Sequence, residues 1–117
     1  MINPVELRIG NFIYRQNGFH DKISAYDFEH ANFEALNPIP LTPEILGKSG
    51  FDSGVGGFFI KDSDGDWLLF NGLVNGVLEP DMYYTGANIS EKAKPKYLHQ
   101  LQNLYFALTG EELKIEL

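Results

Sequence analysis

The sequence contains no cysteine, few basic residues and no long apolar run. Without cysteine, a disulfide, a thiolate nucleophile and a cysteine-ligated zinc or iron–sulfur centre are all excluded. No stretch reaches the roughly 18 apolar residues of a membrane-spanning helix. The first residues also lack the basic and apolar regions of a secretory signal peptide. We therefore expect a cytoplasmic protein that does not cross a membrane.

Nine Lys and Arg residues stand against 16 Asp and Glu residues, which gives a formal net charge of −7. Proteins that bind the nucleic-acid backbone generally carry a surplus of positive charge, so nucleic acid is a disfavoured partner. The acidity is concentrated in residues 51–91, which hold seven acids and one base. Residues 1–50 and 92–117 carry only −2 and +1. A local basic surface on either end therefore stays compatible with the composition.

Hydrophobic residues make up 44% of the 117 residues, and aromatic residues 14%, which is enough for one core. A chain of this length typically forms a single domain, here residues 1–117. Strand-type patterns fill most of the first 90 residues, together with one short and one long helical pattern. We predict an α+β fold with mainly antiparallel strands, a short central helix and a long C-terminal helix packed on the sheet.

The N-terminal segment predicts a β-hairpin. Residues 6–15 have strand character and are interrupted at Gly10, where we expect a bend or a bulge. Asn17-Gly18 is typical of a tight turn, because both residues tolerate a positive φ. Residues 19–28 are predicted to form the second strand, and a weaker pattern predicts a further strand at 31–36.

Two helices are predicted with defined ends. Thr42-Pro43-Glu44 combines an N-cap residue, a proline suited to the first helical position and an acid that favours the positive helix end. Gly50 ends this short helix. Near the C-terminus, apolar residues recur at i, i+3 and i+4 over residues 95–109, and Gly110 marks the end. Residues 113–117 alternate apolar and charged side chains, as in a strand or an extended tail.

Between the two helices, residues 58–61 and 67–70 flank an acidic turn, which predicts a second hairpin. Asn71-Gly72 and Asn75-Gly76 indicate two further turns, with short strands beyond them.

Three blocks of the sequence, taken in order, are distinctive. The most specific is KYLHQLQNLYFALTGEEL at residues 96–113; ELRIGNFI at 6–13 and PIPLTPEIL at 38–46 are the others. Together they resemble a family of small uncharacterised proteins from Bacteroides-type gut bacteria, often encoded in prophage or mobile-element regions. The resemblance implies this origin and no assigned activity. The opening block is also similar to the first strand of SH3-like small barrels.

Asp62, Asp64 and Asp66 lie in the acidic turn and are candidate binding residues. Carboxylates two residues apart offer the hard oxygen ligands that calcium prefers, although the glycine and glutamate spacing of an EF-hand is absent. Two interpretations stay open, a solvated turn, which we favour, and a weak cation site. With the other acids of 51–91, the same carboxylates could instead face a protein partner, as in a protein that mimics DNA.

His99, Gln102 and Phe106 share one side of the predicted C-terminal helix, outside its main apolar face. Such a patch could contact a protein partner or a second copy of the chain. Alternatively, the helix is flanked on two sides and buries Phe106 in its own core. We expect the histidines of the chain, His20, His30 and His99, at the surface or at its edge.

Arg8, Arg15 and Lys22 lie on the predicted N-terminal hairpin and define an alternative function. On a small barrel, aromatic strand residues can stack on single-stranded nucleic acid when a basic groove accompanies them. These three residues could supply such a groove.

No catalytic constellation is recognisable in the sequence. The serines lack a nucleophile-elbow motif, and Gly47-Lys48-Ser49 lacks the preceding glycine of a phosphate-binding loop. We therefore assign no catalytic residue, cofactor or metal. The leading hypothesis is a non-enzymatic accessory protein of a mobile element or prophage that acts through contacts with an unknown protein. The alternative is a small barrel that binds nucleic acid through the N-terminal hairpin.

Overall fold

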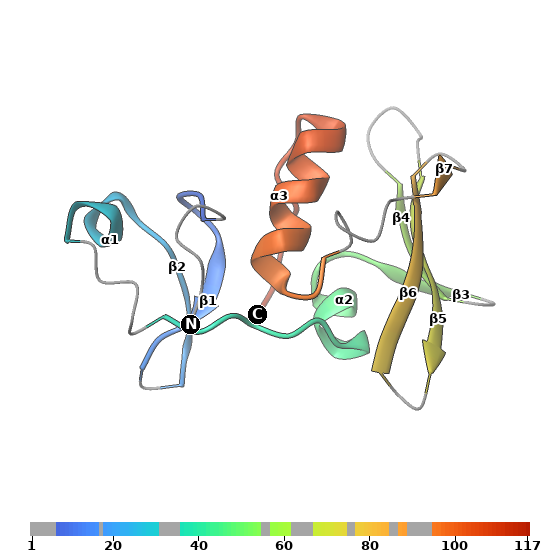
Figure 1. Cartoon of the computed structure of the whole chain (residues 1–117), viewed down its shortest axis with the longest axis horizontal. Coiled ribbons are helices and arrows are strands. Elements are labelled where there is room, and N and C mark those ends of the chain that lie inside the picture. Colours follow the sequence, from blue (N-terminus) through green and yellow to red (C-terminus); the bar gives the residue numbers. More distant parts are fainter. Residues whose placement is uncertain are drawn as a thin grey trace. The chain divides into compact units, whose positions relative to one another are not determined.

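A computed structural model describes most of the chain and divides it into two compact units (Figure 1). Unit 1 comprises Met1–Pro40 and Pro95–Glu112, and unit 2 comprises Leu41–Lys94 and Leu113–Leu117. The residues that the structure describes are 7–16, 18–30, 36–54, 57–61, 67–74, 77–84, 87–88 and 95–117.

Unit 1 begins with an antiparallel hairpin of β1 (Phe12–Tyr14) and β2 (His20–Lys22). A bend or a bulge is predicted at Gly10, and the hydrogen bonds there are those of a bulge. The Gly10 amide donates to the carbonyl of Ile23 at 2.8 Å, and the Ile23 amide donates to the carbonyl of Asn11 at 2.8 Å. Two residues of one strand thus oppose one residue of the other, and the φ of Gly10 is +94°.

The outer edge of β1 is paired as well. Tyr14 and Asn37 exchange two backbone hydrogen bonds of 2.9 Å, so the chain returns beside β1. The side chains of Leu7, Ile13, Ile23 and Leu36 form the apolar core of this part of the unit.

The predicted second strand is wrong beyond residue 22, because residues 25–30 are helical. Helix α1 (Ala25–His30) follows directly after the hairpin. The Ser24 amide donates to Oδ2 of Asp27 at 2.9 Å, so the carboxylate closes the first turn of the helix in the manner of a capping box. This local interaction outweighs the strand character of the aromatic residues.

Helix α3 (Leu98–Thr109) is the longest helix that the structure describes. It begins three residues later than the predicted 95, because Tyr97 is extended and forms a β-bridge with Pro40. The side-chain oxygen of Gln100 accepts from the amides of Lys96 and Tyr97. As predicted, the helix ends at Gly110, which has a φ of +74°.

In unit 2, helix α2 (Pro43–Lys48) confirms the predicted central helix. The Thr42 hydroxyl accepts from the Ile45 amide at 3.1 Å. At the other end Gly50 has a φ of +86°, and the Phe51 amide donates to the carbonyl of Leu46 at 3.0 Å. Side-chain and backbone hydrogen bonds therefore close both ends of this short helix.

The remaining strands of unit 2 form one antiparallel sheet in chain order (Figure 1). The hairpin predicted from residues 58–61 and 67–70 is confirmed, with Lys61 opposite Trp67. The sheet consists of β3 (Asp52–Gly54), β4 (Gly57–Lys61), β5 (Trp67–Val74), β6 (Val77–Tyr84) and β7 (Ala87–Asn88).

Asn71-Gly72 does not form the predicted turn but lies inside β5, where the register with β6 shifts between Asn71 and Leu73. The opposing strand contains Pro80, which has no amide hydrogen to donate and falls within the same irregular stretch. An irregularity thus lets two long strands pair where the sequence favoured separate short ones.

Residues 113–117 follow α3 as an extended tail, in which the Glu116 amide donates to the carbonyl of Lys48 at 2.8 Å. The predicted α+β class with antiparallel pairing is confirmed. Neither sheet closes into a barrel within the described residues.

Candidate functional site

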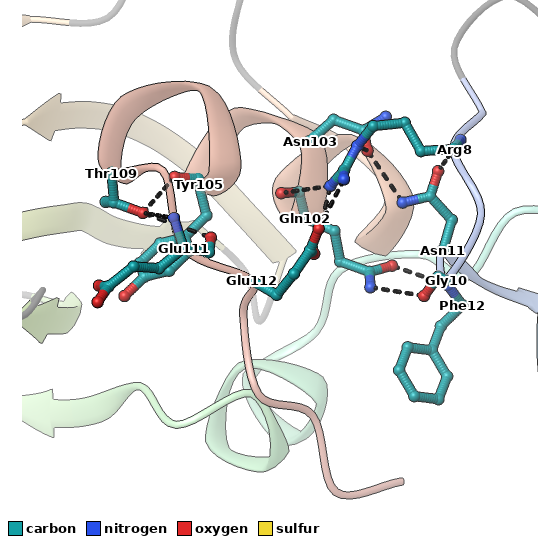
Figure 2. A network of polar contacts seen from close by, with 10 residues as sticks. All are labelled: Arg8, Gly10, Asn11, Phe12, Gln102, Asn103, Tyr105, Thr109, Glu111 and Glu112. Carbon is teal, nitrogen blue, oxygen red and sulfur yellow. Dashed lines mark hydrogen bonds and ion pairs between the residues drawn. The ribbon is translucent and has the colours of Figure 1, made fainter.

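In unit 1, the side-chain amide of Gln102 pairs with the backbone edge beside β1 (Figure 2). Its oxygen accepts from the Phe12 amide at 2.7 Å, and its nitrogen donates to the carbonyl of Gly10 at 3.1 Å. A partly buried backbone edge needs such partners, because an unsatisfied amide or carbonyl that is withdrawn from water is costly. Gln102 therefore supplies from α3 what a neighbouring strand would supply, and it is buried for this reason.

Arg8 connects the start of unit 1 to the end of α3 (Figure 2). Its Nε donates to Oδ1 of Asn103 at 2.7 Å, and its Nη1 donates to Oε1 of Glu112 at 2.7 Å. The guanidinium also lies over the ring of Phe106, 4.6 Å from its centroid. Arg8 is thus engaged by a carboxylate, an amide and an aromatic ring within the unit.

The predicted patch of His99, Gln102 and Phe106 does not form one surface. His99 and Gln102 are buried, so the expected surface position of His99 is wrong. Phe106 is 41% exposed, which excludes the alternative that it lies in the core. The reason is that the side of α3 that carries Gln102 faces the backbone of Gly10 and Phe12, and is therefore buried although it is polar. A hydrophobic periodicity cannot detect a buried polar side chain.

A second polar cluster joins Arg15, next to β1, with Asp27 of α1. Nη1 and Nη2 of Arg15 donate to the two carboxylate oxygens of Asp27 at 2.7 and 3.0 Å. Nε donates to Oδ2 of Asp21 at 2.8 Å, and Nη2 also donates to the carbonyl of Lys22 at 3.1 Å. This planar, two-pronged geometry is the strong form of an arginine–carboxylate pair.

The charges of this cluster stabilise one another. The hydrogen bond from Arg15 lowers the pKa of Asp27 to about 2, in spite of the burial that opposes ionisation, and the Ser24 amide adds to the effect. The same arginine lowers the pKa of Asp21, and the two carboxylates raise the pKa of Arg15. All three groups are therefore charged at neutral pH.

The burial pattern of α1 is the reverse of the usual one. Asp27 is buried, with 3% of its surface exposed, whereas Tyr26 and Phe28 are 63% and 39% exposed. Large aromatic residues are normally turned inward, and acids outward. We call Tyr26 and Phe28 the aromatic pair of α1. This pair, together with the part-buried ion pair of Arg15 and Asp27, is the candidate functional site.

The residues of the proposed nucleic-acid groove have other roles in the structure. Arg8 binds Glu112, and Arg15 binds Asp21 and Asp27. Lys22 is exposed, and its ammonium group lies 5.2 Å from the centroid of the Phe12 ring. The two arginines are therefore held by carboxylates and do not present a free basic surface.

The acidic turn with Asp62, Asp64 and Asp66 lies outside the described residues, as does the side chain of His30. His20 is exposed and stacks on Tyr14, with 4.8 Å between the ring centroids. In the described ranges, no group of three or more His, Cys, Asp or Glu side chains is arranged to hold a metal ion. No helix among those described is both long and apolar enough to cross a membrane.

Sequence reasoning missed the role of Asp27 as the buried partner of Arg15. The signal was present in Ser24-Ala25-Tyr26-Asp27, which has the serine and acid spacing of a helix N-terminus. The aromatic residues beside it favoured a strand instead. The pairing with Arg15 could not be predicted, because it depends on the fold of the hairpin.

Comparison with known proteins gives no relative. No protein-family model, no curated protein and no solved structure matches the chain.

Proposed function

We propose that the protein is a non-enzymatic accessory protein that binds another protein through α1. The observation that carries the proposal is the reversed burial of this helix, with an aspartate inside and the aromatic pair at the surface. Aromatic residues are enriched in protein interfaces. Two large aromatic side chains left in water forgo apolar burial in the isolated protein, and contact with a partner would recover it.

The positions of the side chains around α1 indicate what kind of partner fits. Successive helical residues are about 100° apart, so Tyr26 and Phe28 flank the buried Asp27 on opposite sides. The outward ridge between them carries Ala25 and Glu29, both exposed. The Glu29 carboxylate, on the ridge between the two aromatic residues, suits a basic side chain of a partner. Such a side chain can pair with Glu29 and lie over one of the rings. We therefore propose a partner segment that contains lysine or arginine.

The setting that we propose is the bacterial cytoplasm, in the context of a prophage or mobile element. The resemblance of residues 96–113 supports this setting, and gene neighbourhood would test it. The alternative function, an SH3-like small barrel that binds nucleic acid, stays a prediction. The engagement of Arg8 and Arg15 with carboxylates does not favour it.

Affinity capture from a host lysate with matched variants tests the proposed function. The double variant Tyr26→Ser and Phe28→Ser should lose a partner that the unmodified chain retains, and Glu29→Lys should weaken retention. Ile9→Ser is the control, because Ile9 is also in unit 1 and is 62% exposed. It should retain the partner.

Three results would count against this proposal. One is capture that does not change in the α1 variants, and another is the absence of any specific partner together with a monomer on sizing. Self-association that the same variants abolish would point to a second copy of the chain and not to a basic segment of another protein.

A further inference from the structure

Helix α1 has six residues and cannot be stable through its own hydrogen bonds. Isolated helices shorter than about 12–15 residues are marginal in water, because helix nucleation is costly. The helix therefore depends on contacts with the rest of unit 1.

The deepest of these contacts is electrostatic. Of the α1 side chains that the structure describes, residues 25–29, only that of Asp27 is buried. Its two carboxylate oxygens bind the two terminal nitrogens of Arg15. The apolar core formed by Leu7, Ile13, Ile23 and Leu36 contains no α1 residue. Undocking of α1 would therefore take no member out of this cluster.

Arg15 is held on the hairpin independently of α1. It donates to the Asp21 carboxylate at 2.8 Å and to the carbonyl of Lys22 at 3.1 Å, and both residues belong to β2. If Asp27 leaves, Arg15 keeps a charged partner in Asp21 and is not left as an isolated charge. When Asp27 leaves with its helix it gains water, which solvates a carboxylate well. The charges of Arg15 and Asp27 are thus paired or solvated both when α1 is docked and when it is undocked.

We propose that α1 is a detachable segment, held on the hairpin by the pair Arg15–Asp27, that undocks and returns while the core of unit 1 stays folded. This inference concerns the isolated chain and does not rest on the proposed partner. Local opening of this kind is expected where a segment contributes few buried apolar contacts. Undocking of α1 would move the aromatic pair between two arrangements, one docked on the hairpin and one released from it.

Amide hydrogen exchange of the full chain at low denaturant concentrations tests the proposal. In the unmodified chain, the amides of Phe28 and Glu29 should exchange through a local opening. The free energy of that opening should depend little on denaturant concentration, since local opening exposes little surface. The amides of Leu101 and Tyr105 in α3 should exchange through a larger, denaturant-dependent opening. If the α1 amides exchange only through that same larger opening, the proposal is overturned.

Two substitutions identify the contact that holds the segment. Asp27→Asn should accelerate exchange in α1 about 10- to 100-fold, the range expected for losing hydrogen bonds to a charged group, without changing α3. Phe28→Ala should accelerate it much less. An equal or larger effect of Phe28→Ala would show that the ring, and not the ion pair, holds α1. If Asp27→Asn fails to fold, the measurement on the unmodified chain still decides.

Discussion

The two short helices, α1 and α2, have the same length of six residues and are held in opposite ways. In α2 the apolar residues Ile45 and Leu46 are buried, and both ends are closed by local hydrogen bonds. In α1 the buried side chain is Asp27, and the aromatic pair is exposed. Apolar burial holds one helix, and an ion pair holds the other.

The comparison teaches that helix length does not decide how a helix is fixed. Apolar burial contributes about 25 cal/mol for each Å² and does not depend on protonation. An ion pair depends on the charge of both partners, so conditions that change the charge should act on α1 and not on α2. The comparison therefore predicts different responses to substitution and to pH.

The largest expected difference concerns truncation of the buried leucine. Leu46→Ala in α2 should reduce the free energy of unfolding by about 2–5 kcal/mol, because the side chain is fully buried. Tyr26→Ala in α1 should change it by less than about 0.5 kcal/mol, because most of that side chain is exposed. Urea unfolding of both variants measures the difference, and equal effects would contradict the comparison.

The next difference concerns acid. The pKa of Asp27 is about 2 in the folded chain, below the value of about 3.9 for an unperturbed aspartate. Since the folded-state pKa is depressed, the stabilisation by this carboxylate is present above pH 4 and is lost as the pH falls toward 2. Chemical shifts of Ala25 and Phe28, which do not titrate, should report undocking of α1 in this interval. In Asp27→Asn the same shifts should lack this transition, and an identical transition would assign it to another group.

The smallest difference concerns the N-caps. Thr42→Ala should destabilise the chain by about 1 kcal/mol, because the hydroxyl accepts from the Ile45 amide. Ser24→Ala should cost less, since alanine retains the backbone amide that donates to Asp27 at 2.9 Å and loses only the longer bond of the hydroxyl, at 3.3 Å. Thermal unfolding would rank the two variants, and a larger loss for Ser24→Ala would contradict the different capping of the two helices.

The sequence predicts those parts of the fold that depend on local chemistry. Thr42, Pro43 and Gly50 define α2, Gly10 defines a bulge, and Gly110 defines the end of α3. Where local signals compete, prediction fails: the aromatic residues near Asp27 favoured a strand, and Asn71-Gly72 favoured a turn where β5 continues. A continuing strand depends on its partner, here β6, which a local signal does not include.

The polar contacts of unit 1, the candidate site among them, were less predictable than the fold. Gln102 is buried because it satisfies the backbone of Gly10 and Phe12, about 90 residues earlier in the chain. Arg8 and Arg15 were predicted as a basic surface from their charge alone, but their carboxylate partners become neighbours only in the folded unit. Polar residues that act through distant partners leave no periodic pattern.

A double-mutant cycle of Arg15→Gln and Asp27→Asn, followed by hydrogen exchange of the α1 amides, tests most directly whether an ion pair holds α1. The matched reference is the cycle of Arg8→Gln and Glu112→Gln. Because the Glu112 side chain is 58% exposed, the coupling between Arg8 and Glu112 should stay below about 1 kcal/mol. We predict a coupling of about 1.5–3 kcal/mol between Arg15 and Asp27. Additive effects, with a coupling below about 0.5 kcal/mol, would contradict the account.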